Sequence, residues 1–190
     1  MRRAFLALLA GAVLAGCTGP AATPSPSPGA GTRSSPPVQL TVRAPVDDIL
    51  SDGEVGLARG GGRDHLGLTQ AAEEQQNQPL ALIRYRAWGW VDQAARSWSG
   101  GSLQVSESVL LLTKLDGARL AFFDYANEVR AQPFQPLACP PSLGLDDCAE
   151  ARSGGSARLA GRVGPYLFRL EVSSGDVEAL AAKQAAKIRA

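Results

Sequence analysis

The sequence predicts an α+β domain: an antiparallel sheet of two hairpins, with or without a further N-terminal strand, on which about three helices pack. Two pairs of apolar stretches flank short glycine-containing turns, which is typical of hairpins and therefore of antiparallel pairing. Apolar residues recur with helical spacing before, between and after these pairs.

The predicted domain is preceded by a segment with the features of a signal peptide. Arg2 and Arg3 form a short positive region, and residues 4–15 are uninterrupted and apolar. A helix of this length reaches roughly 18 Å, which is too short for the ~30 Å hydrocarbon core of a membrane. We therefore predict that residues 1–16 are a cleaved signal peptide rather than a permanent membrane span.

The end of this segment carries the motif Leu14-Ala15-Gly16-Cys17. Together with the preceding regions, it resembles the signal and lipobox of bacterial lipoproteins, whose pattern is Leu, small, small, Cys. The resemblance covers residues 1–17 and implies cleavage before Cys17 and a lipid thioether on that cysteine. It also implies anchoring to a bacterial cell membrane, with the domain exposed outside the cytoplasm, at the cell surface or in the periplasm. The alternative is an ordinary secretory signal with a chance cysteine.

Residues 17–38 are the predicted lipid anchor and disordered tether. Residues 18–37 contain six prolines and no apolar periodicity, a composition that buries too little apolar surface to fold. A proline-rich chain extends by ~3.1 Å per residue, so this segment reaches up to about 60 Å from a membrane. Residues 39–190 remain for a single exported globular domain.

The charge balance argues against nucleic acid as a partner. The whole chain has 19 Lys+Arg and 18 Asp+Glu. Removal of residues 1–16 takes away Arg2 and Arg3, which leaves 17 against 18, a formal charge of −1. A near-neutral domain lacks the positive field that holds a phosphate backbone.

The first part of the domain is predicted as a strand, a loop and a helix. Residues 38–43 alternate between apolar and polar, which favours a strand, and the glycine-rich stretch 45–68 is predicted as a loop. Thr69 is the expected N-cap of a helix that ends near Trp88. Pro79 either kinks this helix or begins a second one.

The segment 90–113 predicts the first hairpin. A turn at Gly100 and Gly101 places Trp98 opposite Leu103. The continuous apolar run near the end of this segment is typical of a strand that is covered on both faces.

Helical spacing is clearest directly after this hairpin, in residues 115–129, with Thr113 or Asp116 as the expected cap. A second hairpin over 156–173 and a last helix complete the chain. The apolar stripe of the middle helix consists of Leu115, Ala118, Phe122, Ala126 and Val129, widened by Leu120 and Phe123.

Cys139 and Cys148 are the two cysteines of the predicted domain. Export places them in a potentially oxidising compartment, and the loop between them is rich in turn-forming residues. We therefore predict a disulfide, which restricts the unfolded chain by about 2.5–3 kcal/mol. A metal site and a redox-active pair are the alternatives, but the single histidine and the spacing of the cysteines favour neither.

His65 is the single histidine and the candidate for general-base chemistry. No Gly-x-Ser-x-Gly motif accompanies it, and an exposed loop histidine is the simpler interpretation. The glycine run from Arg59 to Arg63 is interpreted as a mobile loop rather than an anion site, and Asp146-Asp147 as a solvated turn rather than a calcium loop. The sequence therefore assigns no residue to catalysis, a cofactor or a metal.

The three tryptophans lie within eleven residues, close to Tyr85. Trp88 and Trp90 are predicted to fill the core between helix and sheet. Trp98 stands beside the hairpin turn, so it is the tryptophan predicted to be exposed and the candidate for a ligand or partner surface.

The sequence thus favours a membrane-anchored envelope lipoprotein with a non-catalytic binding or interaction domain of unknown ligand. Its expected partners are the membrane, through lipid on Cys17, and an envelope protein or a small ligand. The alternative function is a small secreted hydrolase or transferase that uses residues around His65.

Overall fold

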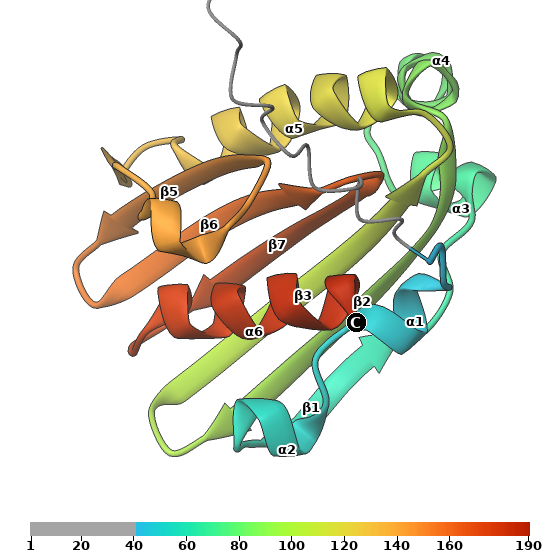
Figure 1. Cartoon of the computed structure of the whole chain (residues 1–190). Helices are drawn as coiled ribbons and strands as arrows, with labels where there is room; N and C mark the ends of the chain where they lie inside the picture. Colours follow the sequence, from blue (N-terminus) through green and yellow to red (C-terminus); the bar gives the residue numbers. More distant parts are fainter. Residues whose placement is uncertain (1–40) are drawn as a thin grey trace, which may run out of the picture. The chain divides into compact units, whose positions relative to one another are not determined.

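The computed structural model describes residues 41–190 (Figure 1). The predictions for the signal peptide, for Cys17 and for the tether lie outside these residues. Of the strand predicted over 38–43, the structure describes residues 41–43, which are not part of a strand.

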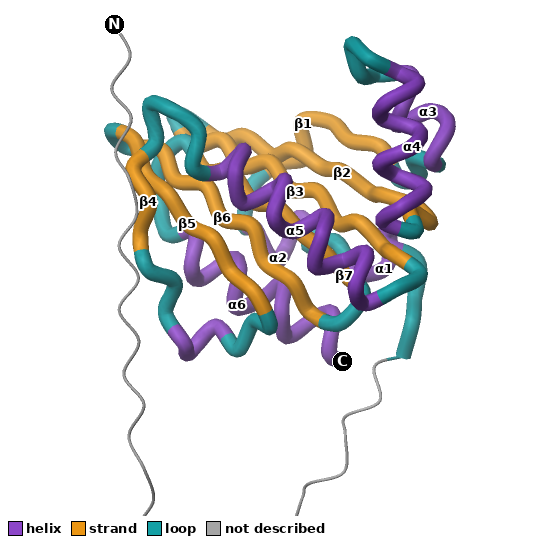
Figure 2. The backbone as a smooth tube through the Cα atoms, turned by 90° about the horizontal axis from the view of Figure 1, so that it is seen from above, coloured by secondary structure: helices purple, strands orange, loops and turns teal. Residues whose placement is uncertain are grey.

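The described residues form one seven-stranded antiparallel sheet with helices on both faces (Figures 1 and 2). The strand order is β1-β2-β3-β7-β6-β5-β4. The strands are β1 (Ala58–Arg63), β2 (Trp90–Gly100), β3 (Leu103–Leu112), β4 (Gln135–Leu137), β5 (Asp147–Ser153), β6 (Ser156–Val163) and β7 (Tyr166–Val172). The helices are α1 (Pro45–Asp48), α2 (Asp52–Val55), α3 (Leu68–Glu73), α4 (Gln78–Trp88), α5 (Leu115–Val129), α6 (Val177–Arg189) and the short 3-10 helix η1 (Pro141–Leu143).

The predicted α+β class with an antiparallel sheet is confirmed, but the prediction of two hairpins and about three helices gives too few strands and too few helices. β2 with β3 and β6 with β7 are the predicted hairpins, and pairing of β3 with β7 joins them. β1 contains the glycine run that the sequence predicts as a loop. It joins the sheet by backbone pairing with β2. Because half of its residues are glycine, it has no alternation of apolar and polar side chains that would reveal a strand.

The sheet has a separate apolar layer on each face, because successive side chains of a strand point to opposite sides. One layer lies under α1 and α6 and includes Phe168 and Leu170. The other lies under α5 and includes Leu110 and Leu167. Figure 2 shows α5 and α6 on opposite sides of the strands.

Pro79 begins a second helix rather than kinking a single one. It lies in the first turn of α4, where its missing N–H costs no helical hydrogen bond. The side chain of Asn77 caps this helix by accepting a hydrogen bond of 3.3 Å from the N–H of Leu80. The predicted cap at Thr69 is wrong, because Gly67 is the N-cap of α3 and Thr69 lies inside the helix.

The turn of the first hairpin lies one residue later than predicted. Gly100 pairs with Leu103, and Gly101 takes a left-handed φ of 61°, which glycine adopts without a steric penalty. Trp98 therefore lies opposite Val105 instead of Leu103.

The apolar face of α5 is narrower than predicted. Leu120 and Phe123 are 54% and 64% exposed, since the helix contacts the sheet mainly through a stripe of smaller residues. The N-cap is Lys114, without a side-chain cap, so neither Thr113 nor Asp116 serves as one.

Cys139 and Cys148 form the predicted disulfide, with their Cα atoms 6.1 Å apart. Cys148 belongs to β5, and the closed loop contains η1. The bond therefore ties an irregular segment to the sheet.

Candidate functional site

One face of the sheet is covered by α5 over only part of its length. Beneath α5, β3 presents Leu110 and Leu112. Farther along the same face, the alternation of side chains presents Ser106 and Ser108 instead, of which Ser106 is exposed and Ser108 half-buried. The change from leucine to serine on one strand face leaves a polar strip of sheet beside the helix.

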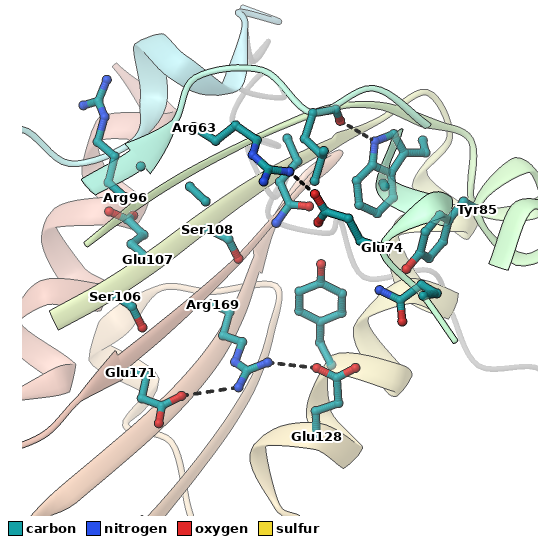
Figure 3. A pocket seen from close by; sticks show the side chains of 18 of the residues that line it. Arg63, Glu74, Tyr85, Arg96, Ser106, Glu107, Ser108, Glu128, Arg169 and Glu171 are labelled. Atoms are coloured by element: carbon teal, nitrogen blue, oxygen red, sulfur yellow. Dashed lines mark hydrogen bonds and ion pairs between the residues drawn. The ribbon is translucent and has the colours of Figure 1, made fainter. Parts of the chain in front are cut away.

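This strip is the floor of a cavity of about 630 Å³, which we call the groove (Figure 3). β2, β3 and β7 supply the floor, α3, α4 and α5 the walls, and β1 one rim. The polar groups that line it include Arg63, Glu74, Ser97, Ser106, Ser108, Glu128, Arg169 and Glu171, and the aromatic ones are Tyr85, Trp88, Trp90 and Tyr125.

A second cavity of about 510 Å³ continues the groove along the sheet. The two cavities share Ser97, Ser106 and Glu171. The second one is lined largely by hydroxyl and amide groups, which include Ser99, Gln104, Ser156 and Ser173.

The aromatic end of the groove is a packed cluster. The ring centroid of Tyr85 lies 5.2 Å from that of Trp88 and 4.6 Å from that of Trp90. The indole N–H of Trp90 donates to the carbonyl of Leu66 at 3.0 Å, which fixes this ring. The predicted core positions of Trp88 and Trp90 are confirmed, since they are 6% and 8% exposed. Their remaining surface contributes to the groove.

Two phenol hydroxyls in the groove are free to bind a ligand. Burial raises the pKa of both Tyr85 and Tyr125 above the ordinary value of 10, so both stay protonated at neutral pH. Among the hydrogen bonds of residues 41–190, none involves either hydroxyl. Each can therefore donate to a ligand and accept from it.

The four arginines that line the groove are all paired with carboxylates of the domain. Arg63 pairs with Glu74 across the rim, from β1 to the end of α3 (Figure 3). On the floor, Arg169 pairs with Glu128 at 2.9 Å and with Glu171 at 3.4 Å. Arg84 and Arg96, which also line the groove, pair with Asp124 at 3.3 Å and with Asp64 at 3.6 Å. Each guanidinium group of the groove therefore already faces a carboxylate of the domain.

The expected exposure of Trp98 is wrong. Its side chain points to the opposite face of the sheet and is 1% exposed, and its indole N–H donates to Asp52 at 2.8 Å. A residue beside a hairpin turn is exposed only if no other segment covers it, and here α2 covers Trp98. Trp98 therefore offers no ring surface to a ligand or partner.

His65 lies in the loop after β1, and its imidazole is 67% exposed, as predicted. Nδ1 is 2.8 Å from an oxygen of Asp92. This hydrogen bond raises the pKa of His65 and favours the imidazolium form. Within the described residues no hydrogen bond joins His65 to a serine, threonine or cysteine, so the structure brings no nucleophile to this histidine.

The other candidate ionic sites are engaged in pairs within the domain. Arg59 pairs with Asp52 at 3.2 Å, and the rim pair of Arg63 is described above, so the guanidinium groups flanking the glycine run face carboxylates. Asp146 and Asp147 both pair with Arg162. Both segments therefore make structural contacts.

Sequence reasoning misses the groove because its residues come from seven elements. One local signal was present: the alternating positions of β3 change from Ser106 and Ser108 to Leu110 and Leu112 on a single face. Such a change marks the border between an uncovered and a covered part of a sheet.

The chain was compared with known proteins and structures. No family model matches it, and no curated protein matches it. Among solved structures, it is similar to the extracellular domain of PknH from Mycobacterium tuberculosis, with 12% identity and a TM-score of 0.49. The match covers 80% of this chain and 98% of that chain. We draw no functional conclusion from a match at this level.

Among the helices of residues 41–190, none combines the length and the apolar character that crossing a membrane requires.

Proposed function

We propose that this chain is a bacterial envelope lipoprotein whose domain binds a ligand without catalysing a reaction. The groove carries the binding function, because it joins a polar floor to an aromatic end and holds two phenol hydroxyls without a partner among the described residues. Concave sites of this size, with apolar walls and a few polar groups that orient the ligand, are typical of small-molecule binding.

Two features support the location outside the cytoplasm. The motif Leu14-Ala15-Gly16-Cys17 supports a lipid anchor, and two or three acyl chains on one residue hold a domain without a protein span. The Cys139–Cys148 disulfide is typical of exported proteins.

The start of the described chain lies on the α6 side of the sheet. The backbone N–H of Arg43 donates to the hydroxyl of Tyr166 at 2.6 Å, and its guanidinium group donates to the carbonyl of Lys187. These partners lie on the α6 side of the sheet, whereas the groove opens on the α5 side. The first described residues are therefore held on the face opposite the groove.

Tryptophan fluorescence tests the binding function, because Trp88 and Trp90 line the groove. The full chain, extracted in a zwitterionic detergent, is titrated with fractions of a cell-envelope extract. A saturable change is expected for the wild type and is expected to disappear in Ser108→Phe, whose ring fills the floor. Ser142→Phe is the matched control, because Ser142 is an exposed residue of η1 outside both cavities. A signal that all three proteins share, or none in the wild type, would contradict binding in the groove.

The anchor is tested by fractionation and by labelling with radioactive palmitate. Cys17→Ser is expected to abolish the label and to release the domain from the membrane. Cys139→Ser, which breaks the disulfide, is expected to keep both the label and the membrane association. A Cys17→Ser chain that is processed and retained like the wild type would show that no lipid anchor exists.

A further inference from the structure

We infer that the ligand of the groove is an uncharged oligosaccharide, which lies across the strands with one sugar ring against Tyr85. This inference rests on the proposed binding function and names the class of ligand. It is carried by the pairing of the groove charges, the order of the floor side chains across the sheet, and the aromatic end.

The pairing of charges favours a neutral ligand. A carboxylate or phosphate ligand would need a free guanidinium group, but Arg169 already contacts two carboxylates, and Arg63, Arg84 and Arg96 contact one each. A cation would have to displace these same guanidinium groups. Either exchange forfeits charge-assisted hydrogen bonds that exist within the domain, whereas a neutral hydroxyl adds bonds to the unused lone pairs and N–H groups.

The floor presents hydrogen-bonding side chains in a row that crosses the strands. Strand pairing places Ser97 opposite Ser106 and Ser106 opposite Glu171, and on the same face it places Ser108 opposite Arg169. Neighbouring strands lie ~4.8 Å apart, a spacing that brings a new polar group to each successive unit of an extended sugar chain. The row mixes hydroxyl, carboxylate and guanidinium groups, which match the donors and acceptors of sugar hydroxyls.

The row begins at an open rim. Gly61 of β1 pairs with Ser97 and has no side chain to block it. A long chain can therefore pass over β1 and out of the groove, whereas an enclosed pocket would limit the ligand to one or two units.

The aromatic end suits the apolar C–H face of a sugar ring. Tyr85 is half-buried, and its ring is backed by Trp88 and Trp90. A sugar ring placed on this surface packs against the aromatic face and reaches the hydroxyl groups of Tyr85 and Tyr125 with its own hydroxyls. Aromatic and polar recognition are thus combined at one end.

Two other ligand classes fit the floor less well. A lipid tail on Ser97 and Ser106 would remove their hydroxyl groups from water without giving them a partner, which costs free energy. An extended peptide binds to sheets by pairing with a free strand edge, but β2, β3 and β7 each have a strand on both sides. The floor therefore offers side chains rather than backbone groups.

The test uses the full chain in a zwitterionic detergent, because a detergent with sugar head groups would compete. Calorimetry measures binding of neutral oligomers of glucose, mannose, galactose and N-acetylglucosamine, beside an oligogalacturonate and a neutral peptide. A neutral oligosaccharide is expected to bind with an affinity that rises with chain length and changes little with salt concentration. It is also expected to displace the envelope-extract ligand from the groove.

Matched variants test whether the sugar contacts the floor of the groove. Ser106→Ala removes the hydroxyl without adding bulk to the floor, and it is expected to weaken binding by up to about tenfold. Tyr85→Leu removes the aromatic face and is expected to weaken binding at least as much. Ser142→Ala, outside both cavities, is expected to bind like the wild type, and circular dichroism checks that each variant is folded.

The outcomes separate the two proposals. If the extract ligand binds in the groove but no neutral oligosaccharide binds or competes, the saccharide inference is overturned and the binding function stands. Preferential binding of the uronate or the peptide overturns it in the same way. If neither the extract nor any tested compound binds, both proposals fail.

Discussion

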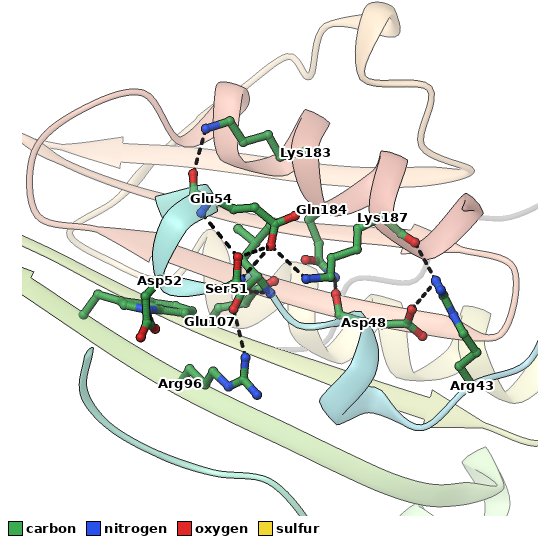
Figure 4. A network of polar contacts seen from close by, with 12 residues as sticks. Arg43, Asp48, Ser51, Asp52, Glu54, Arg96, Glu107, Lys183, Gln184 and Lys187 are labelled. Atoms are coloured by element: carbon green, nitrogen blue, oxygen red, sulfur yellow. Dashed lines mark hydrogen bonds and ion pairs between the residues drawn. The ribbon is translucent and has the colours of Figure 1, made fainter. Parts of the chain in front are cut away.

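The backbone N–H of Leu50 donates a hydrogen bond of 3.1 Å to the side chain of Glu107, which is 3% exposed (Figure 4). The other carboxyl oxygen of Glu107 is buried without a partner among the described residues. Burial raises the pKa of Glu107 to about 8, although the Leu50 N–H opposes the rise. Arg96 donates to the carbonyl of Leu50 at 3.1 Å, so side chains of β2 and β3 hold both backbone groups of one residue between α1 and α2.

This buried carboxyl group predicts a pH-dependent stability. Between pH 4.5 and about 8 the unfolded chain has released the proton of Glu107 while the folded chain retains it. The stability of the fold therefore decreases as the pH rises through this range, by at most about 1.4 kcal/mol per pH unit from this group. Glu107→Gln, which stays neutral, is expected to flatten the dependence and to raise the stability at pH 8. Urea unfolding at several pH values measures it.

Glu54 provides a control of opposite sign. Burial would raise its pKa, but hydrogen bonds from Lys187 and Ser51 outweigh burial and lower the pKa to about 2. The folded chain thus gains stability above pH 4.5 that is lost as the pH falls toward 2. Glu54→Gln is expected to be less stable than the wild type at neutral pH.

Equal pH profiles for the wild type and Glu107→Gln would show that Glu107 titrates normally in the folded protein.

The disulfide predicts a sensitivity to reductant. The double substitution Cys139→Ser and Cys148→Ser is expected to lower the free energy of unfolding by about 2–3 kcal/mol, because the open loop gains freedom in the unfolded chain. Urea unfolding with and without reductant measures the difference. The wild type is expected to lose stability on reduction, whereas the double variant is not. An equal response of both proteins would mean that the bond is not formed in solution.

Gly117 lies where α5 packs against the end of α4, and a substitution there is predicted to disturb this packing. A Cβ atom on Gly117 would overlap the carbonyl group of Trp88, at the end of α4, so Gly117→Ala is expected to cost roughly 1–3 kcal/mol and to shift the walls of the groove. Thermal unfolding and tryptophan fluorescence measure both effects. Gly53→Ala is the control, since nothing lies within 4 Å of its added methyl group, and it is expected to be neutral or stabilising. A harmless Gly117→Ala would indicate a looser packing of these helices.

Substitution of His65 tests whether the domain only binds a ligand or also catalyses a reaction. Because His65 contacts Asp92 and no nucleophile among residues 41–190, the wild type and His65→Ala are both expected to show only background turnover of generic ester, peptide and glycoside substrates. Product formation is followed by absorbance and mass spectrometry. Turnover by the wild type that His65→Ala abolishes would contradict a purely binding function.

Much of the local structure could be predicted from the sequence. The hairpins of β2–β3 and β6–β7, the helix α5 and the disulfide all depend on residues that lie close together in the chain. Periodicity and turn chemistry act at that range. β1 could not be predicted in this way, because a glycine run becomes a strand only when β2 supplies its hydrogen-bonding partner.

The sequence by itself determined the α+β class and the pairing of the two cysteines, since each depends on local composition or spacing. Tertiary structure decided which tryptophans are buried and where a ligand can bind. α2 covers Trp98, and α3, α4 and α5 enclose the serine strip of β3 only after the sheet has brought distant segments together. Burial and concavity arise from the packing of several elements, and no periodicity along one segment encodes them.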